Sequence, residues 1–310
     1  MRRIYAIGEI VFDIIFQEGV VKEARAGGSS LNCSVSLGRL SANVSLISAV
    51  GNDEHGKIID NFLKTNNVNT DFIERKLDGK TTVALAFLDE NQNANYSIYK
   101  DNSLAVSDVS KINFSANDLL ICGSLFSVSE ETYRFASELM ENANCNNSIV
   151  YYDPNFRKQY LAELENLMPR YLLNTSKADI IRGSDEDFFY LFGTYNAQDI
   201  FYKIPNFQNK VLIYTKGSKG VELITNRLHI SMETPEIEPV STIGAGDNFN
   251  AGVLYMLVKE NITKDNLLKI EEVLWKKILN TAQLFAADVC MQFGNSISED
   301  FALKMRSLEE

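Results

Sequence analysis

The stretch Ser241-Thr242-Ile243-Gly244-Ala245-Gly246-Asp247 ends a polar loop and begins a helical pattern. The apolar side chains that fall on one face of this pattern are Phe249, Val253, Met256 and Leu257. The small residues let backbone N–H groups approach an anion closely, and the helix directs the positive end of its dipole there. Asp247 follows at once, where its carboxylate could take a proton from a hydroxyl. The stretch therefore predicts a phosphoryl-transfer site or, alternatively, a glycine turn with Asp247 as helix N-cap.

Short apolar runs alternate with helical patterns in the rest of the chain. The runs expected to form buried strands cover residues 3–7, 44–50, 119–122, 149–152, 179–181 and 211–214. This alternation predicts an α/β fold with a mostly parallel sheet covered by helices on both faces. Ligands of such sheets bind beyond the carboxyl ends of the strands, so polar residues that follow a strand are candidates for the site.

Two segments interrupt the alternation with hairpin patterns. They cover residues 14–26 and 82–100, and the second has its turn at residues 89–93. Both segments leave and rejoin the α/β alternation. We therefore expect a single domain over residues 1–310, with a small β-sheet lid built from two insertions. A lid would exclude water from the site. The alternative is a pair of extra strands on the edge of the main sheet.

The composition argues against several classes of function. The 310 residues carry a formal net charge of −11, which argues against nucleic acid and an anionic membrane as main partners. The four cysteines are scattered and the two histidines are far apart, so no zinc site, disulfide framework or Ser-His-Asp triad is expected. The N-terminus does not resemble a signal peptide, and no apolar run reaches the roughly 18 residues of a membrane span. We therefore expect a cytoplasmic protein.

Two polar clusters near the N-terminus are candidates for ligand binding. Asp13 follows the first strand in a very apolar stretch, where its carboxylate suits adjacent sugar hydroxyls or serves as a surface or capping group. Residues 26–32 open a helix with two glycines. The glycines allow close approach to a ligand, or they form a turn with Ser29 or Ser30 as the helix N-cap.

Three further clusters follow later strands. In residues 153–157, Asp153 and Arg157 are suited to contact hydroxyls or phosphate, or they pair with each other to hold the turn. Residues 184–187 contain three successive acids, which could organise Mg²⁺ or could simply stabilise the N-terminus of a helix. Residues 215–220 are small enough to admit a nucleotide, or they form a plain turn; they are not a Walker A motif.

Together these pieces resemble the ribokinase-like (PfkB) family of carbohydrate and nucleoside kinases. The resemblance runs across nearly the whole chain in the family's order. Residues 27–32 and 242–247 look like the two family signatures, and residues 50–56 resemble its glycine-bounded acidic turn. Residues 153–157 resemble the D-P-N-x-R stretch common in the fructokinase branch. Each motif alone is weak to moderate, but the order and spacing make the resemblance strong.

The resemblance implies a three-layer α/β/α sandwich with a β-sheet lid, and ATP-dependent phosphorylation of a sugar hydroxyl, with fructose as the expected acceptor. It makes Asp247 the general base, and it builds the anion hole from the backbone N–H groups of Gly244, Ala245 and Gly246. The residues that it assigns to the sugar are Asp13, Gly27, Gly28, Asn32 and Arg157. The residues that it assigns to the nucleotide are Thr215, Gly217, Gly220 and Asn280, with Asp187 for Mg²⁺.

The sequence departs from the family pattern at two positions. Ser241 stands where the family usually has an Asp that supports a monovalent-cation site, which leaves activation by K⁺ open. Ser184 replaces the amide of the family's N-x-x-E magnesium motif, and Asp187 supplies a shorter acid. Asp247 also carries a physical expectation of its own, because a carboxylate at a helix N-terminus has its pKa lowered and is then a weak base.

Two other functions remain as alternatives. A nucleoside kinase would need an aromatic clamp for a base, which the lid residues Phe87, Tyr96 and Tyr99 could supply if they do not simply pack within the lid. A sugar-binding sensor without turnover would explain the changes at Ser241 and Ser184. An exposed lid face would also allow two copies to pair as a homodimer.

Overall fold

The computed structural model describes residues 2–88, 94–101, 104, 106 and 112–308, and the turn expected at 89–93 lies outside this part. A nine-stranded sheet in the order β13-β12-β11-β10-β9-β8-β1-β4-β5 forms its centre. The strands are β1 (Ile4–Ile7), β4 (Val44–Gly51), β5 (Ile73–Lys76), β8 (Leu119–Gly123), β9 (Ile149–Asp153), β10 (Ile180–Ser184), β11 (Val211–Thr215), β12 (Val221–Ile224) and β13 (His229–Met232). The seven strands β5, β4, β1, β8, β9, β10 and β11 pair in parallel, and β12 and β13 extend the sheet as an antiparallel hairpin.

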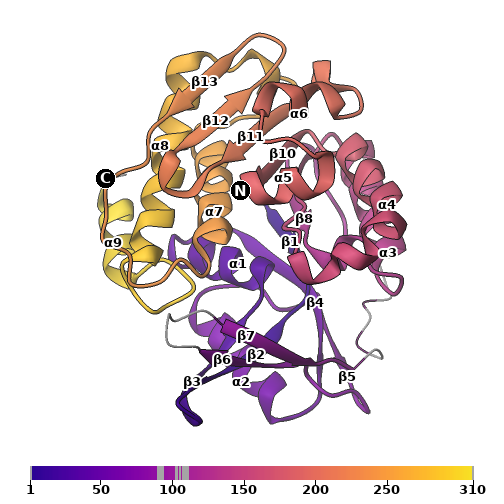
Figure 1. Cartoon of the computed structure of the whole chain (residues 1–310), viewed down its shortest axis with the longest axis vertical. Helices are drawn as coiled ribbons and strands as arrows, with labels where there is room; N and C mark the ends of the chain where they lie inside the picture. Colours follow the sequence, from indigo (N-terminus) through magenta and orange to yellow (C-terminus); the bar gives the residue numbers. More distant parts are fainter. Residues whose placement is uncertain (1, 89–93, 102–103, 105, 107–111, 309–310) are drawn as a thin grey trace.

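Helices cover both faces of this sheet, and each face has its own apolar cluster. One face carries α1 (Ser29–Arg39), α2 (Glu54–Thr65), α7 (Ala245–Lys259), α8 (Glu272–Cys290) and α9 (Glu299–Ser307). The other carries α3 (Tyr133–Cys145), α4 (Leu164–Lys177), α5 (Asp185–Phe192) and α6 (Ala197–Lys203). In Figure 1, α7 to α9 lie left of the sheet and α3 to α5 lie right of it. The prediction of an α/β sandwich is confirmed.

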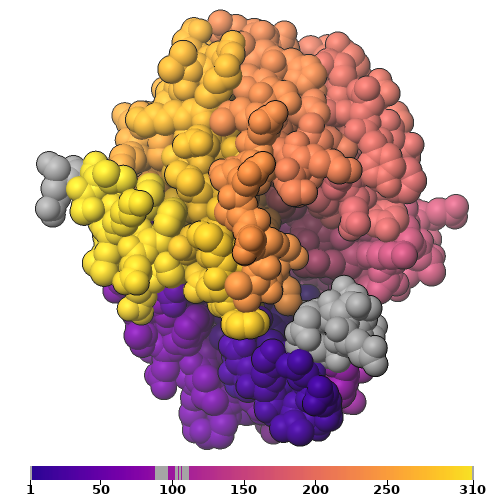
Figure 2. Space-filling view, turned by 60° about the vertical axis from the view of Figure 1, so that its left-hand side comes forward, coloured from indigo at the N-terminus to yellow at the C-terminus, as the bar shows by residue number. Residues whose placement is uncertain are grey.

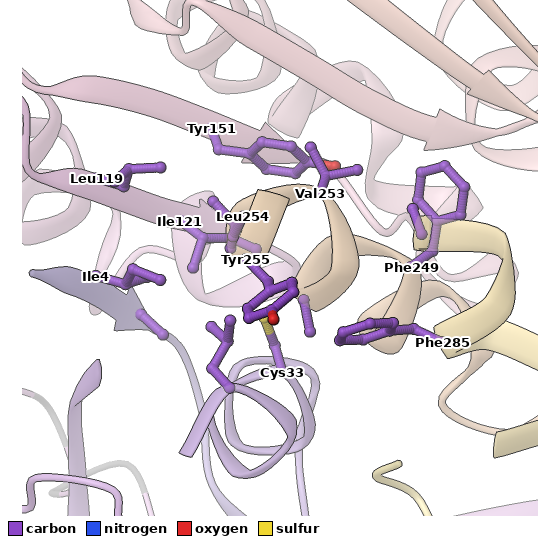
Figure 3. Packing of buried hydrophobic residues seen from close by; sticks show 14 of the residues in the cluster. Ile4, Cys33, Leu119, Ile121, Tyr151, Phe249, Val253, Leu254, Tyr255 and Phe285 are labelled. Carbon is purple, nitrogen blue, oxygen red and sulfur yellow. The ribbon is translucent and has the colours of Figure 1, made fainter. Parts of the chain in front are cut away.

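Helix α7 is the structural centre of the first layer. Its residues from Asp247 to Leu257 are all buried, because α8 and α1 pack against the helix and its apolar side chains share a core cluster with the strands. Val253 and Leu254 pack with Ile121 of β8 and Tyr151 of β9 in one apolar cluster (Figure 3). This packing fixes the start of α7 relative to the carboxyl ends of the strands.

A second, four-stranded sheet has the order β3-β2-β6-β7. Its strands are β2 (Val11–Gln17), β3 (Val20–Gly27), β6 (Val83–Leu88) and β7 (Ala94–Tyr99), and they form two antiparallel hairpins joined by a parallel β2–β6 pair. The sheet is separate from the nine-stranded one and lies at the bottom of Figure 1. The alternative of extra strands on the edge of the main sheet is therefore wrong.

Two further properties concern the cysteines and the helices of the described residues. All four cysteines are free, and Cys145 is the exposed one. Within the part of the chain that the structure describes, every helix is too short or too polar to cross a membrane.

Candidate active site

The N-termini of α1 and α7 meet beside the carboxyl ends of the central strands. Gly244 is the N-cap of α7 and has φ +80°, a left-handed conformation that favours glycine. A Cβ on Gly244 would lie 2.9 Å from the carbonyl oxygen of Asn295. Asp247 is the third residue of α7, so the alternative that made it the N-cap is wrong.

Two side chains of helix α1 bind the Asp247 carboxylate. Ser29 Oγ donates to Asp247 Oδ1 at 2.6 Å, and Asn32 Nδ2 donates to Oδ2 at 2.8 Å. The alternative in which Ser29 or Ser30 caps α1 is wrong, because the N-cap is Gly28 and makes no side-chain cap. Ser30 Oγ donates instead to the carbonyl of Ile7, which ties α1 to the end of β1. Two segments more than 200 residues apart therefore build one carboxylate site.

The environment of Asp247 raises the pKa of its carboxyl above the ordinary value. Burial is the largest cause, and it outweighs the hydrogen bonds from Ser29 and Asn32 and the positive charge of Arg157, which lower the pKa. The expectation that the helix N-terminus lowers this pKa is therefore wrong, because the side chain is only 9% exposed. A carboxylate with a raised pKa is a stronger base, which suits proton abstraction.

Two further polar groups belong to the residues assigned to a sugar. Asn32 is buried and its Oδ1 has no hydrogen-bond partner in the described residues, so it can accept a ligand hydroxyl. Asp13 lies on β2, and burial raises the pKa of its carboxyl to about 6, although the charge of Arg25 opposes this. A Cβ on Gly27 would come within 2.1 Å of Asp13 Oδ2, so only glycine at this position avoids a clash with the carboxylate.

Gly28 and Arg157 complete the set of residues assigned to a sugar. Gly28 has φ +119°, and a Cβ there would meet the carbonyl of Glu9 at 2.4 Å. Arg157 is exposed, and its charge acts on Asp247 from outside the buried site. The alternative that paired Asp153 with Arg157 is wrong, because Asp153 accepts from Arg182 at 3.0 Å.

The residues assigned to a nucleotide lie along β11 and α8. Thr215 ends β11, and the single turn Gly217–Lys219 follows it. Gly217 has φ +54° with open space where a Cβ would be, whereas a Cβ on Gly220 would meet the carbonyl of Met232 at 2.1 Å. Asn280 lies on the exposed side of α8. The open space at Gly217 fits the close approach of a phosphate or ribose.

Helix α8 and the loop of Gly217 are connected by hydrogen bonds near Asn280. Gln283, one turn further along α8, donates to the carbonyl of Glu233 at 2.9 Å. The neighbouring Thr234 hydroxyl donates to the carbonyl of Gly217 at 3.0 Å. These two hydrogen bonds therefore link α8, which carries Asn280, to the loop that carries Gly217 through residues 233–234.

Asp187, the residue expected at Mg²⁺, forms a capping box with Ser184 at the start of α5. Its Oδ2 accepts from Ser184 N and Ser184 Oγ, both at 2.7 Å, which leaves Oδ1 for a ligand. Among the described residues, no group of three or more acids, histidines or cysteines could hold a metal ion. This donor set fits a Mg²⁺ held mainly by phosphate and water, with one carboxylate contact. Ser241 Oγ accepts from Ile243 N at 3.2 Å within its own turn.

Three residues of the site were missed in the sequence. The position of Ser29 before a helix predicts only a cap, yet its hydroxyl donates to Asp247. Arg182 and Asn250 both donate to Asp153, at 3.0 Å and 2.6 Å. Arg182 had a detectable signal, since a charged residue follows directly on the apolar run that predicts its strand.

The surface is hollowed where these elements meet. Figure 2 shows a recess between the orange residues before α7 and the magenta residues beside them, above the indigo residues. Arg25 of β3 spans from the small sheet to the main body by donating to the carbonyl of Phe293, which follows α8. A buried carboxylate and a glycine turn at a helix N-terminus are parts that a phosphotransferase acting on a small hydroxyl compound needs.

Comparison with known proteins agrees with this class. The profile of the pfkB family carbohydrate kinases matches residues 1–297. A fructokinase of Vibrio alginolyticus is 23% identical over 89% of this chain and 90% of its own. The aminoimidazole riboside kinase of Salmonella enterica, solved with aminoimidazole riboside and an ATP analog, superposes with a TM-score of 0.85 at 20% identity over 100% of both chains. The fructokinase of Vibrio cholerae O395, solved with fructose, ADP and a calcium ion, gives 0.81 at 21% identity over 96% of both. The chain belongs to the pfkB family of carbohydrate kinases.

Proposed function

We propose that this protein is an ATP-dependent sugar kinase that transfers the γ-phosphoryl group of ATP to a hydroxyl of fructose. The observation that carries the proposal is the buried Asp247 carboxylate, which Ser29 and Asn32 hold at the N-terminus of α7. The choice of fructose is supported by the relative from Vibrio alginolyticus, which is a fructokinase. Asp13 and the free Oδ1 of Asn32 are suited to accept hydrogen bonds from sugar hydroxyls.

The reaction uses Asp247 as the general base. Its carboxylate accepts the proton of the sugar hydroxyl while the new oxygen–phosphorus bond forms, and the bond from the γ-phosphorus to the bridging oxygen breaks to release ADP. The backbone N–H groups of residues 244–246 and the positive end of the α7 dipole stabilise the charge on the transferring group. The raised pKa of Asp247 makes the proton transfer more favourable.

The remaining site residues bind the second substrate and its metal. Thr215, Gly217, Gly220 and Asn280 would border the nucleotide, and Asp187 Oδ1 would contact Mg²⁺. Bound Mg²⁺ would neutralise part of the phosphate charge. We propose that the sheet β3-β2-β6-β7 acts as the lid that keeps water from this site.

The second candidate, a nucleoside kinase, is favoured by the superposition with the aminoimidazole riboside kinase. The direction of two of the three residues expected to form an aromatic clamp argues against it. Asp13 pairs with Ala84 in the small sheet, so Phe87 and Tyr99 point to the sheet face opposite Asp13 by strand alternation. The side chain of Tyr96 lies outside the described residues.

The proposed setting is the cytoplasm, where the four free cysteines would stay reduced. Two copies would pair through the lid. Val21, Phe16 and Phe87 are neighbours across three strands, and Val21 and Phe87 are 52% and 42% exposed. An exposed apolar row on a sheet favours self-association.

The proposal is tested by ADP release from the purified protein with Mg-ATP and a panel of acceptors. The panel contains fructose, ribose, 2-keto-3-deoxygluconate, tagatose and adenosine, each with and without K⁺. We expect strong turnover with fructose and none with adenosine. Turnover restricted to adenosine would replace the proposal with the nucleoside kinase. Tight sugar binding without any turnover would replace it with the sensor.

A further inference from the structure

Arg182 is a buried cation in the middle of the main sheet. It is the third residue of β10, which lies between β9 and β11, and its exposed fraction is only 8%. Central strands of parallel sheets are covered on both faces and are normally apolar throughout. Burying a guanidinium is costly unless it is paired, and an apolar replacement of such a pair is often at least as stable. A role other than stability would explain why this position holds Arg.

The guanidinium group links the ends of three neighbouring strands. Its Nη1 donates to Asp153 Oδ2 at 3.0 Å at the end of β9, and its Nη2 donates to Thr215 Oγ1 at 2.8 Å at the end of β11. Burial is the largest single influence and would lower the pKa of Arg182, but the interactions with Asp153, Tyr151 and Asp187 together outweigh it and raise the pKa above its ordinary value. The Nε has no partner among the described residues. Arg182 is therefore a fixed positive charge in the site.

The same group lies directly behind the glycine turn of α7. A Cβ on Gly246 would be 2.9 Å from Arg182 Nη1 and 3.1 Å from Nη2, so both terminal nitrogens approach the backbone of this turn. The ring of Phe249 lies 5.6 Å from the guanidinium carbon. Asn250 of α7 donates to Asp153 Oδ2 at 2.6 Å, so the partner of Arg182 is also bound to α7. The ion pair thus fixes the turn relative to the sheet.

We propose that Arg182 is a positioning residue for phosphoryl transfer. It holds the turn at Gly246 in place through Asp153 and Asn250, and it adds a buried positive charge behind the anion hole. This inference rests on the proposed kinase function. Such a charge acts most strongly on the transition state, in which negative charge moves onto the transferring group and the leaving oxygen, and little on the sugar.

The test measures fructose-dependent turnover of Arg182→Met and Arg182→Lys beside the parent. Removal of one preorganised group at such a site costs about 100-fold in kcat, so we expect a loss of about this size in Arg182→Met with the KM for fructose nearly unchanged. Arg182→Lys keeps the positive charge but lacks the planar guanidinium with its several donors, so it should retain part of kcat. A merely structural role would lower stability and leave kcat per folded molecule at the parental value, which would overturn the proposal.

A binding measurement supplies a second readout. Calorimetry compares the affinity for ADP with that for ADP and aluminium fluoride, both with fructose present, because the fluoride complex mimics the transferring group. We expect Arg182→Met to lose affinity for the fluoride complex and to keep most of its affinity for ADP. An equal loss for both ligands, or no loss for either, would contradict the proposal.

The matched control is Lys210, a second buried cation with 7% exposure. It donates to the carbonyls of Ser176 and Ala178 before β10, at the opposite end of the sheet from the glycine turn. Lys210→Met should lower stability without lowering kcat.

A double variant covers the case in which Arg182→Met fails to fold. Arg182→Met combined with Asp153→Asn removes both charges, and its comparison with Asp153→Asn alone isolates the effect of the cation. Equal kcat in those two variants would refute the role of Arg182, whereas absence of turnover in the parent would refute the proposed kinase function instead.

Discussion

Asp13 is the residue whose ionisation state should control sugar affinity. Burial raises the pKa of its carboxyl to about 6, and only the carboxylate form accepts hydrogen bonds on both oxygens. Fructose should therefore bind more tightly as the pH rises through about 6, where the carboxyl loses its proton. Calorimetric titrations between pH 5 and 8 check this. In Asp13→Asn the binding should be weak and nearly independent of pH, and an unchanged pH dependence in that variant would assign the titration to another group.

Ser29 affects the proposed base, Asp247, through one hydrogen bond. Its hydroxyl bond to Asp247 Oδ1 favours the carboxylate and so lowers the pKa of Asp247, against the larger effect of burial. Removal of the hydroxyl in Ser29→Ala should raise this pKa, so the acidic limb of kcat against pH should move to higher pH. Ser30→Ala is the control, because the Ser30 hydroxyl binds the carbonyl of Ile7 and not Asp247. A limb that moves to lower pH in Ser29→Ala would contradict the account.

At the scale of elements, the contact between α7 and α8 fixes the helix that carries Asp247, the proposed base. A Cβ on Gly252 of α7 would lie 2.6 Å from the Cα of Ala282 of α8, so the two backbones would have to separate. We expect Gly252→Ala to lower the free energy of unfolding by about 1–3 kcal/mol, as overpacking does in a dense interior. Denaturant titration measures the change. Gly294→Ala is the control, because the nearest atom to its Cβ is the end of the Gln292 side chain at 3.2 Å. Equal stability of Gly252→Ala and the parent would show that the helix contact is not tight.

Most elements could be predicted from the sequence because their burial patterns are local. The apolar runs located β1, β4, β8, β9 and β11 to within one residue at each end, and the hairpin patterns located the strands of the small sheet. Strand β5 was missed, because three of the four residues of Ile73–Lys76 are charged and hide its pattern. The order of the strands in the sheet could not be predicted, because parallel strands that pair with each other can be far apart in the sequence.

The candidate site was predicted less completely than the fold. The sequence suggested Asp247 and Asn32 as separate motifs, but their hydrogen bond joins residues 215 positions apart and depends on the tertiary packing of α1 on α7. The direction of the Asp247 pKa shift was wrong for the same reason, since burial is a property of the folded molecule. The partner of Asp153 is Arg182, which lies on the neighbouring strand and not in the same turn.

At the scale of the whole molecule, the small sheet presents an apolar row to solvent through Val21, Phe16 and Phe87. We expect light scattering to give the mass of a dimer, and Val21→Lys to give a monomer, because a charge in the row would be buried without a partner. Val273→Lys is the control, since Val273 is 81% exposed at the start of α8, far from the small sheet in the chain. A parent that is monomeric at every concentration would remove the dimer from the account.

The central claim is that Asp247 is the base of a sugar kinase, and it is tested most directly by fructose-dependent ADP release from the parent and Asp247→Asn. General-base catalysis contributes about 10²–10⁴-fold, so we predict a loss of kcat in that range while the variant keeps its fold and binds fructose. Circular dichroism and calorimetry establish the fold and the binding of the same samples. Near-parental kcat in a folded Asp247→Asn variant would contradict the account.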